Sequence, residues 1–147
     1  MVHTYSNDDK IYLVDLMIAY VNIFKYPLST IDTSDYFDCL HDNCWRKHGK
    51  KYSPMDVLKN PTHYEHDMKK IREAELKYPV IMHNGVIVDG MHRLAKAYLQ
   101  NKTELHAYNF GDTLMKKFLI SNSGDYKKLE KFDVHDFIEI FNDRFSK

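Results

Sequence analysis

The fold is decided by the stretch Val86-Ile87-Val88-Asp89-Gly90-Met91-His92-Arg93-Leu94-Ala95-Lys96-Ala97. It opens with three β-branched residues, and after Asp89 and Gly90 its apolar residues recur at helical spacing. The pattern predicts a strand that passes through a glycine turn directly into a helix. A second apolar run, residues 79–82, lies just upstream and is separated from the stretch by His83-Asn84-Gly85. Asn-Gly between two apolar runs is typical of a tight β-hairpin.

The start of this helix is suited to binding an anion. The first N–H groups of a helix have no partner within it, and the helix dipole adds partial positive charge there. Gly90 lets a ligand approach the backbone, and Met91, His92 and Arg93 follow in the first turn, so a phosphate group fits this end. The helical spacing places Leu94, Tyr98 and Leu99 toward the core and leaves His92, Arg93 and Lys96 toward solvent or ligand.

Asp89 does not fit a simple phosphate site, because it places a carboxylate at the mouth of that site. Such a residue is expected to bind a metal ion or to act as a base. The alternative is that Asp89 belongs to a helix cap and that the charges around it are ordinary surface charges.

The stretch resembles the signature strand-to-helix turn of the ParB/sulfiredoxin superfamily, whose pattern after a strand is roughly Gly-x-(His/Arg)-Arg-x-x-Ala. The resemblance covers about residues 51–110, including residues 52–61 and the strand that begins at Pro79-Val80. It implies an α/β (α+β) fold with a small mixed β-sheet and surrounding helices. It also implies that the turn holds nucleotide phosphates. Members of the superfamily include CTP-hydrolysing partition clamps, ATP-dependent sulfinic-acid reductases and free-serine kinases that use ADP.

Within the superfamily, the Asp-Gly-x-His-Arg form of the motif is similar to the free-serine-kinase branch. The sulfiredoxin branch is disfavoured, because Met91 stands where that branch has its catalytic Cys and a thioether cannot perform the same nucleophilic chemistry. The resemblance therefore implies a nucleotide-dependent phosphotransferase or NTPase that uses ATP, ADP or CTP with Mg²⁺ and an unidentified acceptor. The residues that it implies are Asp89, His92 and His66 for catalysis, Gly90, Met91, His92, Arg93, Lys96 and Lys70 for nucleotide binding, and Asp89 for the metal.

His66 and Lys70 lie on a further predicted helix. Thr62 and Glu65 have the spacing of a capping box that opens it. Its apolar face carries Tyr64, Met68 and Ile71, and His66, Lys70 and Glu73 share another face. The resemblance places this helix beside the phosphate pocket, which favours a functional role for His66 and Lys70; solvated side chains are the alternative.

Two other functions remain open. One is a nucleotide-gated DNA-binding, partition or nuclease-type module without phosphotransfer. The 21 Lys and Arg residues are balanced by 21 Asp and Glu, and no second basic helix follows the motif, so nucleic acid is not the favoured partner. The other is an interaction domain that keeps the fold without the chemistry.

The length of 147 residues predicts a single domain with a helical N-terminal part (1–50), a core (51–110) and a helical C-terminal part (111–147). Residues 10–26 are strongly apolar and predict a buried helix capped from within residues 6–9, or else the face of a homodimer. Asp15 and Asn22 interrupt this run, which argues against a membrane span. Leu105 begins a further strand, residues 113–120 predict a short helix and residues 122–124 a loop, and Asp133 is expected to cap an amphipathic last helix.

The cysteine content favours a reducing, intracellular (cytoplasmic) location, because two Cys residues are too few for a disulfide framework. Cys39, His41, Cys44 and His48 lie close together in the sequence, but their spacing does not match a paired zinc knuckle, so zinc is not expected. Trp45, among these polar residues, is expected to close the core rather than to cover a nucleotide base.

Overall fold

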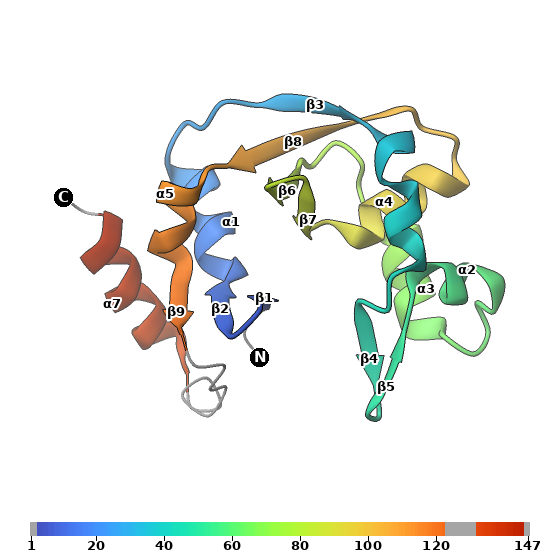
Figure 1. The fold of residues 1–147 in the computed structure, drawn as a ribbon, viewed down its shortest axis with the longest axis horizontal. Coiled ribbons are helices and arrows are strands. Elements are labelled where there is room, and N and C mark those ends of the chain that lie inside the picture. Colours follow the sequence, from blue (N-terminus) through green and yellow to red (C-terminus); the bar gives the residue numbers. More distant parts are fainter. Residues whose placement is uncertain (1–2, 123–131, 146–147) are drawn as a thin grey trace. The chain divides into compact units, whose positions relative to one another are not determined.

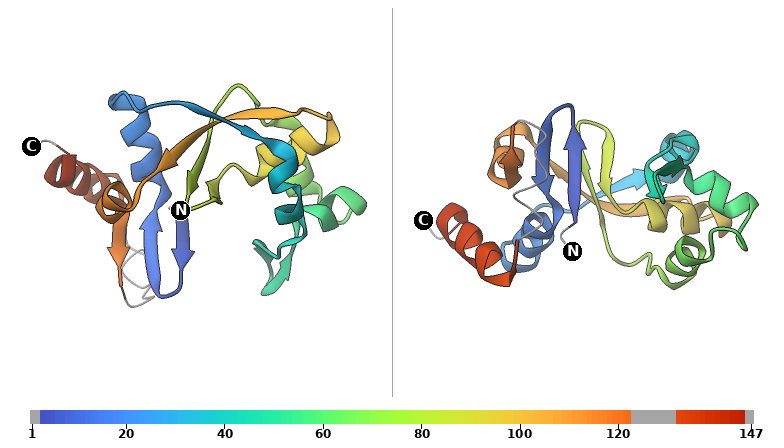
Figure 2. Two further views of the ribbon diagram at one scale, coloured as in Figure 1. Left: turned by 45° about the horizontal axis from the view of Figure 1, so that its top comes forward. Right: turned by 90° about the horizontal axis from the view of Figure 1, so that it is seen from below.

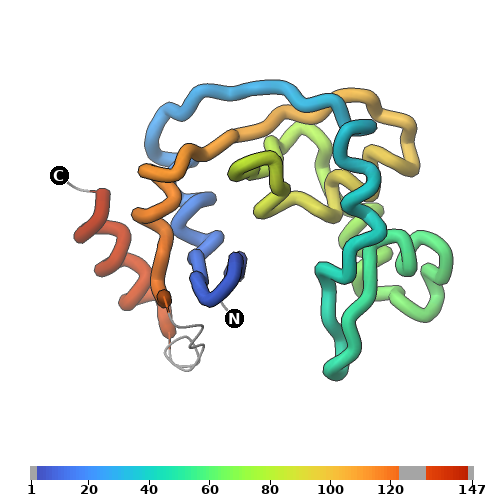
Figure 3. The backbone as a smooth tube through the Cα atoms, in the orientation of Figure 1, coloured from blue at the N-terminus to red at the C-terminus, as the bar shows by residue number. Residues whose placement is uncertain are grey.

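The protein has an α+β fold in which short strands form small sheets and helices pack around them, as the computed structural model shows (Figure 1). The structure describes residues 3–122 and 132–145. The chain forms two compact units: unit 1 consists of Met1–Pro27 and Phe110–Lys147, and unit 2 of Leu28–Asn109. The chain crosses between them after Pro27 and again after Asn109 (Figure 3). The expected fold class is confirmed, and the expected single domain stays a prediction.

Unit 1 contains a three-stranded sheet of order β1-β2-β9, with helices from both ends of the chain (Figure 2). β2 is antiparallel to both of its neighbours. Among the described residues, no helix is long and apolar enough to cross a membrane. The elements of unit 1 are β1 (Thr4–Asn7), β2 (Lys10–Leu13), α1 (Val14–Ile23), α5 (Asp112–Met115), η2 (Lys116–Phe118), β9 (Leu119–Ser121) and α7 (Val134–Phe145).

The helix expected over residues 10–26 needs correction at both ends. Residues 10–13 form strand β2, and Asp8, with a φ of 56°, lies in the turn of the β1–β2 hairpin rather than at a helix cap. α1 begins only at Val14, and its N-cap Leu13 makes no side-chain hydrogen bond. Only the first turn of α1 is buried, because Ile18 and Ile23 are exposed. A buried strand followed at once by this buried turn gives one continuous apolar run, so hydrophobic periodicity does not separate the two.

The C-terminal part of the chain also contains a strand that was not expected. The helix predicted over residues 113–120 ends at Phe118, and Leu119–Ser121 then pairs with β2. Asp133 does cap the last helix, because its backbone N–H donates to the Asp136 carboxylate and its own carboxylate accepts from the Asp136 N–H. The loop expected at residues 122–124 lies outside the described residues from position 123 onward.

A cluster of aromatic rings packs beside the buried aliphatic side chains of unit 1. Tyr20 of α1 lies 5.2 Å from Phe145 of α7 and 5.9 Å from Phe118, measured between ring centroids. Phe24 stacks on Phe141, and Phe110 contacts Phe118. The end of the apolar stripe of α7, at Phe141 and Phe145, thus packs on α1 and its C-cap Phe24, whereas Val134 and Ile138 at its start are exposed.

Unit 2 is built on a four-stranded sheet of order β3-β8-β6-β7. β3 (Ser29–Asp32) is antiparallel to β8 (Glu104–Phe110), and β6 (Val80–His83) is antiparallel to β7 (Val86–Asp89). Asn84 and Gly85 join β6 to β7 with φ angles of 50° and 75°, the left-handed values that a tight hairpin turn requires. The predicted Asn-Gly hairpin and the strand at Leu105 are confirmed.

Helices and one further hairpin complete unit 2, and α4 packs against η1, α2 and α3. Fully buried side chains from these elements form its core, among them Leu40, Val57, Ile71 and Leu94. The elements are η1 (Thr33–His41), β4 (Trp45–Lys47), β5 (Lys50–Tyr52), α2 (Pro54–Lys59), α3 (Glu65–Glu73) and α4 (Met91–Leu99). Residues 1–50 were expected to be helical, but they also contain the strands β1 to β4.

α4 follows Gly90 as predicted, but its buried face is not the expected one. Leu94 is buried together with the small residues Ala95 and Ala97, whereas Tyr98 and Leu99 are 41% and 49% exposed. Tyr98 packs edge-on against Phe37 of η1 at 5.2 Å between ring centroids. Its ring therefore covers the rim of the core rather than filling it.

The capping box expected at Thr62 and Glu65 is absent, whereas α2 opens with a capping box at Ser53. The Ser53 hydroxyl accepts from the Asp56 N–H while the Asp56 carboxylate accepts from the Ser53 N–H. Thr62 is not a cap, because residues 61–64 form a turn in which the Tyr64 N–H donates to the carbonyl of Asn60. α3 begins only at Glu65, and its N-cap Tyr64 makes no side-chain hydrogen bond.

This difference gives a matched pair of stability measurements. Ser53→Ala should lower the free energy of unfolding by about 1 kcal/mol, the usual cost of removing an N-cap oxygen. Thr62→Ala should leave it within about 0.5 kcal/mol of the original, because Thr62 is exposed and caps no helix. Urea denaturation of both variants checks the assignment, and equal losses would contradict it.

Candidate functional site

The turn between β7 and α4 can accept only glycine. Gly90 has a φ of 122°, and a Cβ atom built there would lie 2.5 Å from Cγ1 of Val80 and 2.9 Å from its Cβ. Gly90 is the N-cap residue of α4 and provides no side-chain hydrogen bond to it. The first N–H groups of this nine-residue helix thus lack both intrahelical partners and a capping side chain.

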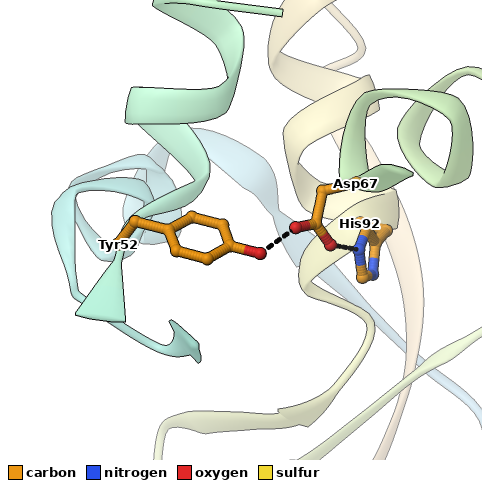
Figure 4. A network of polar contacts seen from close by, with 3 residues as sticks. All are labelled: Tyr52, Asp67 and His92. Carbon is orange, nitrogen blue, oxygen red and sulfur yellow. Dashed lines mark hydrogen bonds and ion pairs between the residues drawn. The ribbon is translucent and has the colours of Figure 1, made fainter. Parts of the chain in front are cut away.

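A buried carboxylate lies beside this helix start. Asp67 of α3 is 8% exposed, and its Oδ1 lies 3.1 Å from Nε2 of His92 in the first turn of α4. Its other oxygen, Oδ2, accepts a hydrogen bond from the hydroxyl of Tyr52, the last residue of β5 (Figure 4). One carboxylate therefore joins a strand and two helices.

These contacts define the protonation state of His92. A carboxylate can only accept, so Nε2 of a neutral His92 carries the proton that it donates to Asp67, and Nδ1 remains an acceptor. Burial lowers the pKa of His92, and this effect outweighs the opposing attraction of the Asp67 carboxylate. Burial and the bond to Asp67 raise the pKa of Tyr52, so its phenol stays protonated and donates.

Aromatic rings surround the Asp67–His92 pair. Trp45 stacks on the His92 imidazole with ring centroids 4.3 Å apart and an interplanar angle of 17°. Tyr64 stacks on Tyr52 at 4.6 Å. Trp45 therefore covers the imidazole of His92, a contact that goes beyond the core-closing role expected for it.

Asp89 and Arg93 are bound to each other. A guanidinium nitrogen of Arg93 lies 3.2 Å from Oδ2 of Asp89, and another donates to the carbonyl oxygen of Pro79 at 2.6 Å. Arg93 thus ties α4 to the residue just before β6. The phosphate contact predicted for Arg93 stays a prediction. In the structure its guanidinium already binds Asp89 and Pro79.

Of the two predicted lysines, Lys96 is bound within the protein, as Arg93 is, whereas Lys70 is exposed. The ammonium of Lys96 donates to the carbonyls of Arg72 and Ala74 at 2.8 and 2.6 Å, which satisfies the C-terminal end of α3. Lys70 is exposed on α3, and its charge acts on His92 and lowers the pKa of that residue. Lys70 is therefore the predicted cation that remains available to a ligand beside His92.

The remaining predicted site residues are placed as follows. Met91 is half-buried and packs against the core of unit 2, so its backbone rather than its side chain is available to a ligand. His66 is exposed on α3, next in sequence to the buried Asp67. The structure thus gathers Asp89, Gly90, His92 and Lys70 around the start of α4.

The sequence prediction omitted the residues that hold His92. Tyr52, Asp67 and Trp45 lie 40, 25 and 47 positions from it, and no local spacing joins them. One signal was present: Asp67 lies three residues after Tyr64 and four before Ile71, on the apolar face of α3. A carboxylate at such a position needs a buried partner.

Cys39, His41, Cys44 and His48 do not form a metal centre in the described part of the chain, where no three or more His, Cys, Asp or Glu side chains are grouped for metal binding. Although Cys44 is exposed as a residue, burial of its thiol raises its pKa to about 11. In the absence of a metal ion this thiol therefore stays protonated at neutral pH.

No protein-family model matches the sequence, and neither a curated protein nor a solved structure is significantly similar to the chain. The ParB/sulfiredoxin resemblance thus rests on the sequence motif alone.

Gly90→Ala tests the steric constraint at this turn. The added methyl group meets Val80 and forces a backbone angle that alanine avoids, so the free energy of unfolding should fall by about 2 kcal/mol or more. Gly111→Ala is the matched control, because nothing lies within 4 Å of a Cβ at Gly111 and its φ is −81°. Denaturation curves that show equal effects would contradict the assignment.

Trp45 provides a direct measurement of His92 protonation, because it is the only tryptophan in the chain. An imidazolium stacked on indole quenches its emission, so fluorescence should fall on acidification with a midpoint below 6.5, the ordinary pKa of histidine. His92→Gln should abolish this transition.

The same titration has a consequence for stability. The unfolded chain protonates residue 92 at a higher pH than the folded chain does. The stability contributed by this group is therefore present above pH 6.5, declines as the pH falls toward the folded pKa, and levels off below it. A midpoint above 6.5 in the fluorescence titration would contradict both expectations.

Proposed function

We propose that unit 2 binds a nucleotide through its phosphates at the start of α4 and catalyses phosphoryl transfer or nucleotide hydrolysis there. The observation that carries this proposal is the uncapped helix start at Gly90, with His92 in its first turn bonded to Asp67 of α3. In motif form, the protein is most similar to the free-serine-kinase branch of the ParB/sulfiredoxin superfamily. ATP, ADP or CTP with Mg²⁺ are the proposed ligands.

Backbone groups provide most of the proposed phosphate contact. Unpartnered N–H groups and the helix dipole favour an anion at this end of α4. The absence of a side chain at Gly90 allows the phosphate to approach the backbone closely. Lys70 adds a positive charge, whereas Arg93 contributes less than its position in the motif implies because it already binds Asp89 and Pro79.

His92 is the proposed general base. In phosphoryl transfer the protein positions the reactants, and one group accepts the proton of the attacking hydroxyl or water. Nδ1 of His92 is free to accept this proton, and the Asp67 carboxylate on Nε2 stabilises the imidazolium that results. Asp67 is a positioning residue in this scheme, and Tyr52 holds its second oxygen.

Asp89 is the proposed Mg²⁺ ligand. It ends β7 directly before the turn, and carboxylate oxygens are suitable ligands for this hard cation. Binding of Mg²⁺ there requires Asp89 to exchange its bond with Arg93. A bound Mg²⁺ ion would neutralise charge on the phosphates.

The proposal is tested first by binding. ATP, ADP, CTP and GTP, each with and without Mg²⁺, are added in a thermal-shift assay, because a ligand that binds only the folded state raises the midpoint. At least one nucleotide should raise it, and Lys70→Gln should weaken that binding. The absence of any shift across the panel at millimolar nucleotide would rule out the proposed site.

Catalysis is then tested with variants that keep the shape of the site. His92→Gln retains a donor toward Asp67 but lacks the base, so turnover should fall by about a hundredfold or more while nucleotide binding persists. Asp67→Asn should lower turnover because it disturbs the orientation of His92. His106→Gln, at an exposed histidine on β8, is the matched control. Full turnover in a folded His92→Gln variant would exclude His92 as the base and direct attention to Asp89.

A further inference from the structure

The β4–β5 hairpin carries a concentration of positive charge that the proposed chemistry does not use. Between Trp45 and Tyr52 the chain reads Arg46-Lys47-His48-Gly49-Lys50-Lys51, with no acidic residue. Each of these residues is exposed. The whole chain has a formal net charge of zero, so this hairpin is a local departure from an otherwise balanced composition.

The strand register places like charges directly opposite each other. Arg46 is paired with Lys51, and Lys47 is paired with Lys50. Opposed like charges destabilise an antiparallel pair. In the part of the chain that the structure describes, none of these four side chains forms a salt bridge. The fold therefore holds together four cations that repel one another, an arrangement that an external polyanion would stabilise.

The shape of the hairpin indicates which polyanion fits. Among the strands that the structure describes, β4 and β5 pair only with each other, and His48 and Gly49 close a tight turn with φ angles of 52° and 78°. Because side chains alternate along a strand, Lys47 and Lys50 lie on one face and Arg46 and Lys51 on the other. The turn points away from the four-stranded sheet of unit 2 (Figure 1).

We propose that this hairpin inserts into the major groove of double-stranded DNA, with the four cations binding phosphates on the two walls of the groove. A two-stranded β-ribbon fits the width of that groove in B-form DNA. Phosphates on both sides match cations on both faces of the ribbon. The major groove of A-form RNA is too deep and narrow for the same insertion, so DNA is the expected partner.

The hairpin is held firmly at its base. Trp45 and Tyr52 are cross-strand partners there, and they contact His92 and Asp67 respectively. A DNA duplex on the tip would therefore lie next to the candidate site. The proposal is independent of nucleotide binding, because it depends on the charges and register of the hairpin.

Fluorescence anisotropy with a labelled duplex of about 20 base pairs, measured over a range of salt concentrations, tests the proposal. The variant Lys47→Gln/Lys50→Gln should bind at least about tenfold more weakly at low salt. The slope of log K against log salt should become shallower by about two, because each lost phosphate contact contributes about 0.9. The change in Trp45 emission on binding provides a second signal from the base of the hairpin.

The matched control is Lys10→Gln/Lys25→Gln, which removes two exposed lysines of unit 1 and changes the net charge equally. It should bind like the original protein. Circular dichroism should show that both variants are folded, and the hairpin variant should be at least as stable as the original because a like-charge pair is gone.

Three outcomes would overturn the proposal: no duplex binding at low salt, an equal loss in the control variant, or equally tight binding of single-stranded DNA or an RNA duplex. Lysine on exposed edge strands also prevents edge-to-edge aggregation, and that role alone predicts the first outcome.

Discussion

The buried carboxylate of Asp67 is the constraint on which unit 2 depends. A carboxylate removed from water is costly unless hydrogen bonds and charges compensate for it. Here the compensation comes from Tyr52 on one oxygen and His92 on the other. β5, α3 and α4 must therefore come together in one arrangement before Asp67 is satisfied. The same bonds orient His92, so one interaction determines both the packing of these elements and the chemistry available at the start of α4.

The cations of α4 show how the fold limits the site. Arg93 links Pro79, before β6, to Asp89, at the end of β7, and so fixes the two ends of the hairpin that contains Val80. Lys96 holds the end of α3. Both were expected to face a ligand, because helical spacing places them away from Leu94. A long cationic side chain on that face can instead reach a neighbouring carbonyl, and spacing alone does not distinguish the two.

Local signals in the sequence predicted local structure well. The turn at Asn84, the glycine at position 90 and the cap at Asp133 each act within a few residues and are present, whereas the capping box expected at Thr62 and Glu65 is absent. Residues 10–13 were misassigned because β2 is defined by its pairing with β1 and β9, which no short window contains. The contacts around His92 were missed for the same physical reason. Trp45, Tyr52, Asp67 and His92 lie on four separate elements.

The β4–β5 hairpin combines two opposed interactions, and their balance explains why it forms. Its outer pairs place like charges opposite each other, which costs roughly 0.2–1 kcal/mol for each pair. Its innermost pair, Trp45 and Tyr52, is anchored by the stack on His92 and by the hydrogen bond to Asp67. The anchor at the base offsets the repulsion toward the tip, so the hairpin can present its cations without a partner. Because Trp45 and Tyr52 are held in one register, the base of the hairpin contacts both His92 and the Asp67 carboxylate that orients it.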